Sequence, residues 1–241
     1  MGALFATRYK SVIITGVCQD FASNSTKPQE NGMFVKSKLP IVFLATCVLC
    51  SAAQAKTFDG PTTLSSQEFE TLTINGPADL DRVKSNTLTV NGPLKFNEVK
   101  ISAKTEVSGP SKGEEGKFGN VMINGPFEAS KVKCDNLVVK GPVSLTKFTI
   151  NGDTHIEGPL EAKKGTFNDI KSVTPPVLLQ DIDIKNITIK KPSNGKDDTL
   201  TLSGETTVSG NITFESGNGK VIMKDKDSTI KGKIIGGQLV K

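Results

Sequence analysis

The chain is poor in the side chains that most catalytic and aromatic binding sites use. Its 241 residues include no tryptophan, one tyrosine, Tyr9, and one histidine, His155. Histidine is the commonest general acid or base in enzymes, and exposed aromatic rings are the platforms on which nucleic-acid bases stack. We therefore expect neither an enzyme nor a nucleic-acid-binding or small-molecule-binding protein, and no cofactor.

Cysteine is also scarce where a folded domain would use it. Three of the four cysteines, Cys18, Cys47 and Cys50, precede residue 56, and only Cys134 follows. A single thiol cannot form an internal disulfide. Cys47 and Cys50 have CxxC spacing, but they lie in an apolar run, which argues against a redox or metal site.

Net charge indicates no nucleic-acid-binding surface. The formal charge is +5, but five of the 30 basic and only two of the 25 acidic residues precede position 56. The remainder has 25 basic and 23 acidic residues, interleaved along the sequence. Interleaved charge is typical of a solvated surface.

Residues 33–55 have the three parts of a secretory signal peptide. A short segment with two lysines precedes an apolar run at 39–49, and small residues end the segment at Ala53 and Ala55. The run is shorter than the roughly 20 residues that a membrane-spanning helix needs. We predict export to the periplasm, the outer surface or the medium, with cleavage after Ala55.

Residues 1–32 show no hydrophobic period, and Met33 fits the start of the signal peptide. We therefore hypothesise that residues 1–32 are untranslated or disordered. Two alternatives stay open for the segment that follows. One is an uncleaved anchor, and the other is a lipoprotein attached at Cys47, because residues 44–46 approximate a lipobox.

A repeat of 16 or 17 residues dominates the chain after residue 56. Its marker is a Gly-Pro dipeptide, and the frame continues at Pro176 and Pro192. The dipeptides are Gly60-Pro61, Gly76-Pro77, Gly92-Pro93, Gly109-Pro110, Gly125-Pro126, Gly141-Pro142 and Gly158-Pro159. Such internal repeats are typical of solenoids, in which each repeat packs only on its neighbours.

Apolar residues recur at fixed distances from each glycine. Around Gly92 they are Leu88, Val90, Leu94, Phe96, Val99 and Ile101. Three runs of period two, separated by corners, predict three short strands per coil, each with one face inward. The predicted fold is all-β: a single-stranded parallel β-helix with coils of about 16 residues, stacked about 4.8 Å apart. It covers residues 56–192, and residues 193–241 are predicted to form less regular C-terminal coils or a cap.

The Gly-Pro corner has a physical basis. Proline fixes its own φ and restricts the residue before it, and glycine accepts the φ that the bend then requires. Asn75, Asn91 and Asn124 precede three of the glycines. We prefer the explanation that asparagine tolerates turn geometry. The alternative is a hydrogen-bonded asparagine ladder along the stack.

Two stretches of the repeat differ from the pattern, and each leads to a prediction. Ser111, Gly113 and Gly116 stand where apolar residues recur, so we expect a thin core there and a bump at residues 114–115. Cys134 falls on an inward position, and we expect it to be a small buried hydrophobe rather than a reactive thiol.

No catalytic, cofactor-binding or metal-binding residue is predicted. His155 alternates with inward neighbours and is expected to be an exposed strand residue. The acidic pairs are interpreted as solvent-facing charge rather than as cation or acid–base sites. They are Asp181 with Asp183, Asp197 with Asp198, and Asp225 with Asp227.

The short coils, small valine-rich strands and glycine corners of residues 57–192 resemble, in repeat style, the bactofilin type of polymer-forming β-helix. The resemblance implies nucleotide-independent self-association through the open ends of the stack. Bactofilins are cytoskeletal, whereas the predicted signal peptide assigns this chain to the cell envelope or beyond.

Three functions are therefore weighed. We favour an exported, non-enzymatic structural solenoid of the cell envelope or surface that can self-associate through its coil ends. The first alternative is a secreted adhesin or binding module that holds an envelope or host-surface partner on its faces. The second is a polysaccharide-active β-helix enzyme, which would need inserted loops and carboxylates beside aromatic rings.

Overall fold

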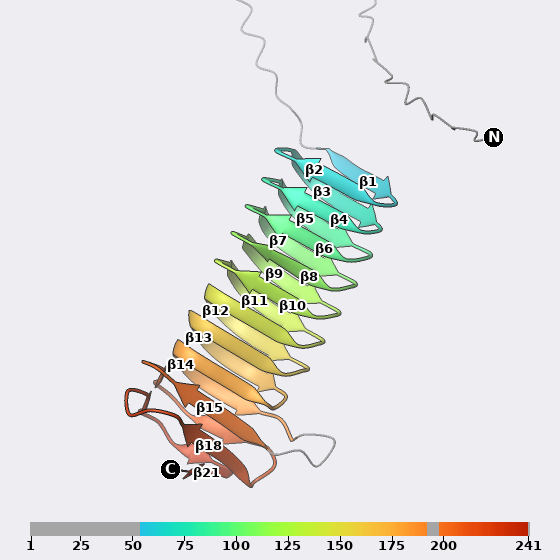
Figure 1. Ribbon diagram of the computed structural model, residues 1–241. Helices are drawn as coiled ribbons and strands as arrows, with labels where there is room; N and C mark the ends of the chain where they lie inside the picture. The colour runs from blue at the N-terminus through green and yellow to red at the C-terminus, as the bar shows by residue number, and fades with distance from the viewer. Residues whose placement is uncertain (1–53, 192–197, 241) are drawn as a thin grey trace, which may run out of the picture. The chain divides into compact units, whose positions relative to one another are not determined.

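The structure is a computed structural model, and it describes residues 54–191 and 198–240. These residues form 21 strands, and the strands pair in parallel with their equivalents in neighbouring coils (Figure 1). The stack has about 11 turns, which confirms the predicted parallel β-solenoid. In the described ranges, no helix is long and apolar enough to cross a membrane.

A coil of the N-terminal half contains a short and a long strand. The short strands are β2 (Thr62–Ser65), β4 (Ala78–Asp81), β6 (Leu94–Asn97), β8 (Ser111–Glu114) and β10 (Phe127–Ser130). The long strands are β3 (Glu68–Asn75), β5 (Lys84–Val90), β7 (Lys100–Val107), β9 (Lys117–Ile123) and β11 (Lys133–Val139). The first strand is β1 (Ala55–Asp59), which pairs with β3.

Strand assignment differs farther along the stack. Each of the next three coils is one continuous strand: β12 (Val143–Ile156), β13 (Leu160–Val173) and β14 (Val177–Ile189). The last coils are built from short pieces: β15 (Thr199–Ser203), β16 (Thr207–Val208), β17 (Ile212–Phe214), β18 (Gly219–Met223), β19 (Thr229–Ile230), β20 (Ile234–Ile235) and β21 (Gly237–Val240).

The core consists of three inward pairs per coil, as the apolar spacing predicts. In the coil of β6 and β7 the inward side chains are all buried: Leu94, Phe96, Val99, Ile101, Thr105 and Val107. The long strand begins just after Val99 and carries Ile101 and the last pair, with a register shift between Ile101 and Lys104. Backbone pairing continues around this third corner, so the second and third predicted strands are assigned as one.

The second corner of each coil is a left-handed residue. Its φ lies between 51° and 57° in eight successive coils, at Ser66, Arg82, Glu98, Glu115, Lys131, Lys147, Lys164 and Asp181. This conformation costs a non-glycine residue about 1–2 kcal/mol. The next coil places Gly204 there, with a φ of 60°. The apolar pattern predicts a corner here but not its left-handed conformation.

Close stacking explains the glycines of the Gly-Pro corners. A Cβ added to Gly76 would lie 2.7 Å from the carbonyl carbon and oxygen of Gly60, and one on Gly141 would lie 2.7 Å from those of Gly125. The predicted reason, conformational freedom, applies to Gly60, Gly76, Gly125 and Gly141, whose φ is positive, but not to the other three glycines. The structure adds a second reason, because only glycine leaves room for the corner of the preceding coil.

The expectation of a thin core and a bump after Gly109 is wrong. Ser111 is 3% exposed, and β8 pairs in register with both β6 and β10. Phe96 fills the space beside Gly113, and Phe118 fills the space beside Gly116. The two rings meet edge to face, with centroids 5.3 Å apart. Rings from adjacent coils thus replace the missing side chains.

The C-terminal coils are less regular, as expected; residues of the first of them stay buried, whereas Met223, Ile230 and Ile234 are only partly buried. Leu200, Leu202 and Ile212 are 0% exposed, and Phe214 is 3% exposed. Residues 1–32 and most of the predicted signal peptide, including Ala53, lie outside the described residues. Ala55 is the first residue of β1 and is exposed.

Candidate functional surfaces

Outward side chains at equivalent positions form columns along the stack. One column lies at the third corner, and we call it the amide–carboxylate column: Asn120, Asn136, Asp153, Asp169, Asn186 and Asn211. Asn136 donates from Nδ2 to Asn120 Oδ1 at 2.7 Å. Asn186 donates from Nδ2 to Asp169 Oδ1 at 2.7 Å. These side chains join one coil to the next.

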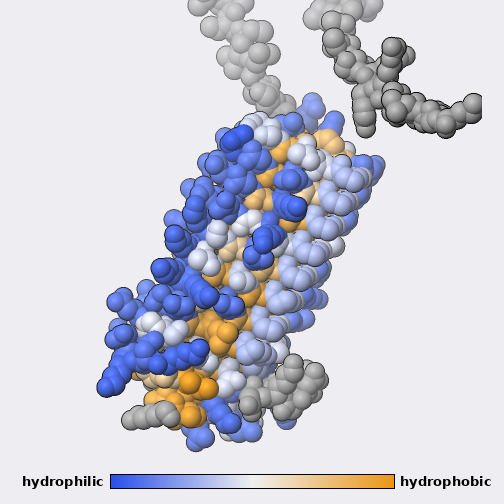
Figure 2. Space-filling model, in the orientation of Figure 1, coloured by the Kyte–Doolittle hydropathy of each residue, from blue (hydrophilic) through white to orange (hydrophobic). Residues whose placement is uncertain are grey.

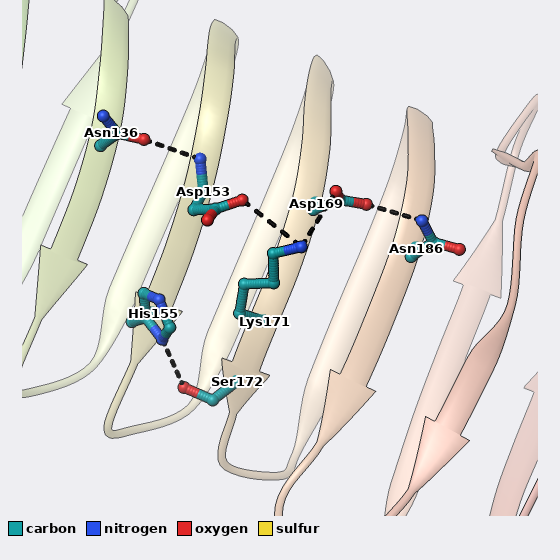
Figure 3. Close-up of polar contacts among 7 residues, drawn as sticks. All are labelled: Asn136, Asp153, His155, Asp169, Lys171, Ser172 and Asn186. Atoms are coloured by element: carbon teal, nitrogen blue, oxygen red, sulfur yellow. Dashed lines mark hydrogen bonds and ion pairs between the residues drawn. The ribbon is translucent and has the colours of Figure 1, made fainter.

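The same column also binds backbone groups. Asn136 Oδ1 accepts a hydrogen bond from the Asp153 N–H at 2.8 Å (Figure 3). Asn186 Oδ1 accepts one from the Asn211 N–H at 2.9 Å. Because each bond bridges neighbouring coils, the column stabilises the stack where the long strands bend.

Lys171 forms ion pairs with both carboxylates of the column. Its Nζ lies 3.3 Å from Asp169 Oδ2 and 3.6 Å from Asp153 Oδ1 (Figure 3). Burial by itself raises the pKa of Asp169. Hydrogen bonds from Asn186 and Lys171, with the charges of Lys171 and Lys185, outweigh burial and hold that pKa below its usual value. The Asp169 hydrogen bond and the two carboxylate charges raise the pKa of Lys171.

His155 is an exposed residue of β12, as predicted. Its Nδ1 lies 3.2 Å from Ser172 Oγ on the next coil (Figure 3). The flanking Thr154 and Ile156 are buried, which confirms the predicted alternation. His155 contacts a hydroxyl group rather than one of the carboxylates drawn with it, so it does not form a His–carboxylate pair.

Two of the other candidate carboxylates, Asp181 and Asp225, accept hydrogen bonds from the backbone. Asp181 Oδ1 accepts a hydrogen bond from the Glu205 N–H at 3.1 Å, and Asp225 Oδ2 accepts one from the Gly204 N–H at 2.7 Å. Asp183 is exposed, as predicted, but Asp198 is only 7% exposed, so the expectation of solvent-facing charge is wrong for Asp198. Asp197 lies outside the described residues. Where the chain is described, no group of three or more His, Cys, Asp or Glu side chains could hold a metal ion.

Asparagines at the Gly-Pro corners do form a ladder. Asn91 Nδ2 donates to Asn75 Oδ1 at 2.8 Å, and Asn75 Nδ2 donates to Asp59 Oδ1 at 2.8 Å. Our preferred explanation, turn tolerance alone, is therefore wrong for Asn75 and Asn91. Each of these two asparagines donates a side-chain hydrogen bond to the preceding coil.

Cys134 is buried, as predicted, with 4% of its surface exposed. Burial, together with the charge of Asp135, raises the pKa of its thiol to about 12. Because the thiolate is the reactive form, this environment makes the thiol inert.

Sequence analysis missed a second column, which consists of Lys84, Lys100, Lys117 and Lys133. We call it the lysine column. Its members begin four successive long strands and are paired in register. All four are exposed. Together with the left-handed corner they line a shallow groove of about 570 Å³.

The lysine column is mostly without counter-charges. Lys84 Nζ lies 3.8 Å from Glu68 Oε2, at the N-terminal end of the column. Among residues 54–191 and 198–240, Lys100, Lys117 and Lys133 form no ion pair within 4.0 Å. The signal that could have found them is a lysine eight residues after each of Gly76, Gly92, Gly109 and Gly125.

The far end of the stack carries an apolar patch. Ile235 is 47% exposed, Leu239 41% and Val240 36%. Figure 2 shows hydrophobic side chains gathered at this end, where Figure 1 places β18 and β21. We call these three residues the end patch.

Comparison with known proteins does not extend these observations: no protein-family model, curated protein or solved structure matches the chain.

Proposed function

We propose that the protein is an exported, non-enzymatic structural solenoid of the cell envelope or surface, and that its stacks associate end to end. The end patch carries this proposal. Leu239 of the last coil is in register with buried Val221 yet is 41% exposed, because no further described coil covers it, and Ile235 and Val240 on the same coil are 47% and 36% exposed. Burying them against another chain would remove apolar surface from water.

Backbone pairing favours the same surface. Among the described strands, β21 pairs in parallel with β18, through Val221 with Leu239. Its other edge carries the N–H and C=O groups to which a further strand can add. The apolar side chains and the strand edge therefore point to one occupant, the first coil of a second copy.

The opposite end offers a matching surface. Phe58 of β1 and Phe69 of β3 are half-buried, and their ring centroids are 6.3 Å apart. Contact between unlike ends is heterologous and does not close on itself, so it produces filaments rather than dimers. Parallel stacking of coils would then continue from one chain into the next.

The side-chain columns support a structural role. Asn75, Asn91, Asn136 and Asn186 use their amides to bond one coil to another. A stack held by hydrogen bonds along its axis, around a continuous buried core, resists separation of its coils. This is the property that a scaffold requires.

The test uses the full chain, expressed in an exporting host and recovered from envelope and medium fractions. Sedimentation velocity and negative-stain electron microscopy of the wild type should show filaments that lengthen with concentration. Leu239→Lys should abolish them. Leu178→Lys is the matched control, because Leu178 is also 41% exposed but lies on the side of the stack, in β14.

Each part of the proposal has its own contradicting result. Wild-type chains that stay monomeric at all concentrations would refute end-to-end association. Equal loss of filaments in the two leucine variants would show that the end patch is not the contact. Recovery of the chain from the cytoplasm alone would refute export.

A further inference from the structure

The lysine column has four like charges in succession. Two other columns contain opposite charges that face each other, Lys112 with Glu128 at 2.8 Å and Lys131 with Glu115 at 2.6 Å. Like charges directly opposite on neighbouring strands are destabilising. Four lysines in register, about 4.8 Å apart, therefore impose a cost on the free protein.

The surroundings of the column add to its positive potential. The groove along it is lined by six basic residues, the lysine column with Arg82 and Lys131, and by two acidic residues, Glu98 and Glu115. Glu115 is neutralised by Lys131. A groove lined mostly by one sign of charge concentrates counter-ions along its length.

We propose that the lysine column binds an extended linear polyanion along the stack axis, and that this polymer is an acidic polysaccharide. The column repeats one cation per coil in a straight line. In an extended acidic polysaccharide the carboxylates recur at about the length of a sugar ring, which is close to the strand spacing. Flexible lysine side chains compensate for the remaining mismatch.

Polar groups beside the column suit sugar hydroxyls. Asn86 and Ser102 line the neighbouring groove with Lys84 and Lys100. Ser102 Oγ donates to Asn86 Oδ1 at 2.9 Å, and both residues are exposed. The amide and hydroxyl groups can accept and donate further hydrogen bonds, so each sugar would meet a cation and a neutral polar group.

Nucleic acid fits the same groove less well. Single strands are held by aromatic side chains on which bases stack, in addition to positive charge. Phe118 is buried and Phe69 is half-buried, and none of the exposed large hydrophobic residues in the described part of the chain is aromatic. The column therefore offers charge without a stacking platform.

The inference rests on the proposed function in one respect, because an exported chain meets such polymers outside the cytoplasm. Its test is binding of sodium alginate, a polyuronate, to the full exported chain by isothermal titration calorimetry. The titrations use a Leu239→Lys background, so that filament formation does not alter the avidity. Neutral dextran and a single-stranded oligothymidylate are titrated in parallel.

The key variant is Lys100→Gln/Lys117→Gln, and the matched control is Lys95→Gln/Lys112→Gln. Lys95 and Lys112 are also exposed and in register on adjacent coils, but lie on the short strands. Both doubles lower the net charge equally. The column variant should weaken alginate binding about tenfold and reduce its salt dependence, whereas the control should change the affinity less than about twofold.

Thermal melting shows whether a variant loses binding only because it is unfolded. Since the column is repulsive, Lys100→Gln/Lys117→Gln should melt no lower than wild type. Absence of alginate binding by wild type, or equal weakening in both doubles, would overturn the proposal. Oligothymidylate that binds as tightly as alginate and shows the same dependence on the column would reassign it to nucleic acid. None of these outcomes affects the filament or fractionation results, which test the proposed function separately.

Discussion

The packing of Phe118 against Gly116 gives the sharpest test of how the core is filled. Gly116 occupies an inward position at which other coils carry Val83, Val99 and Val132. A Cβ added there would overlap the Phe118 ring, lying 2.7 Å from its Cζ, and would lie 3.1 Å from Phe96 Cε2. The atoms in the way belong to rings rather than to backbone, so removing Phe118 should make room for a side chain.

The predicted energies form a double-mutant cycle. Gly116→Val alone overpacks the core and should cost about 1–3 kcal/mol. Phe118→Ala alone leaves a cavity and should cost about 3–5 kcal/mol. In the double variant the valine methyl groups occupy part of that cavity, so the loss should be smaller than the sum by about 0.5–3 kcal/mol.

The measurement is the free energy of unfolding from urea denaturation, followed by far-ultraviolet circular dichroism. Lys112→Ala on the outward face of the same coil is the control. Its ion pair with Glu128 is exposed on both sides, so the change should stay within about 0.5 kcal/mol. Single losses that add to within about 0.5 kcal/mol in the double variant would refute the idea that the ring replaces a valine.

Three further predictions concern the corners, the amide–carboxylate column and the thiol. Gly141→Ala should cost about 1–3 kcal/mol in urea unfolding, because its methyl group would lie 2.7 Å from Gly125; an unchanged midpoint would contradict the stacked corner. The pKa of Asp169 in the folded protein lies below its usual 3.8. The ionised carboxylate therefore stabilises the fold fully above pH 3.8, and this stabilisation is lost as the pH falls through the lowered pKa. Asp169→Asn should therefore lower stability at neutral pH and flatten the fall below about pH 4, and parallel curves for the two proteins would count against this. Cys134, with its pKa raised to about 12, should react with iodoacetamide only after denaturation, as peptide mapping can show, and rapid native-state labelling would mean that its coil opens.

The fold was predictable because stacking imposes the same demand on every coil. A coil that pairs on both sides must present the same inward positions as its neighbours, so the spacing of Leu94, Val99 and Val107 identified three buried faces. The left-handed conformation of the second corner was not predictable in this way. Arg82 and Glu98 both have a positive φ although they carry opposite charges, and the conformation is imposed by the stack rather than favoured by these side chains.

The error at Gly113 and Gly116 has a related cause. Taken as an isolated coil, the sequence around them lacks core side chains. Their space is filled by Phe96 of the preceding coil and by Phe118 of the same coil. Core volume in a solenoid is shared along the stack, so it has to be summed over neighbouring coils.

The lysine column could also have been predicted from the sequence. The reason is the place at which the 17-residue coils carry their extra residue. In two of these coils the extra residue falls at the third corner, between Ile101 and Lys104 in one and between Ile150 and Thr154 in the other. It therefore comes after the lysine position, and counting from each Gly-Pro glycine keeps Lys100 and Lys117 aligned. The charge that appears interleaved along the chain is separated in space, because residues adjacent in the sequence belong to different columns. For a stacked-coil protein the charge of each column, rather than the net charge of the chain, determines what its surface can bind.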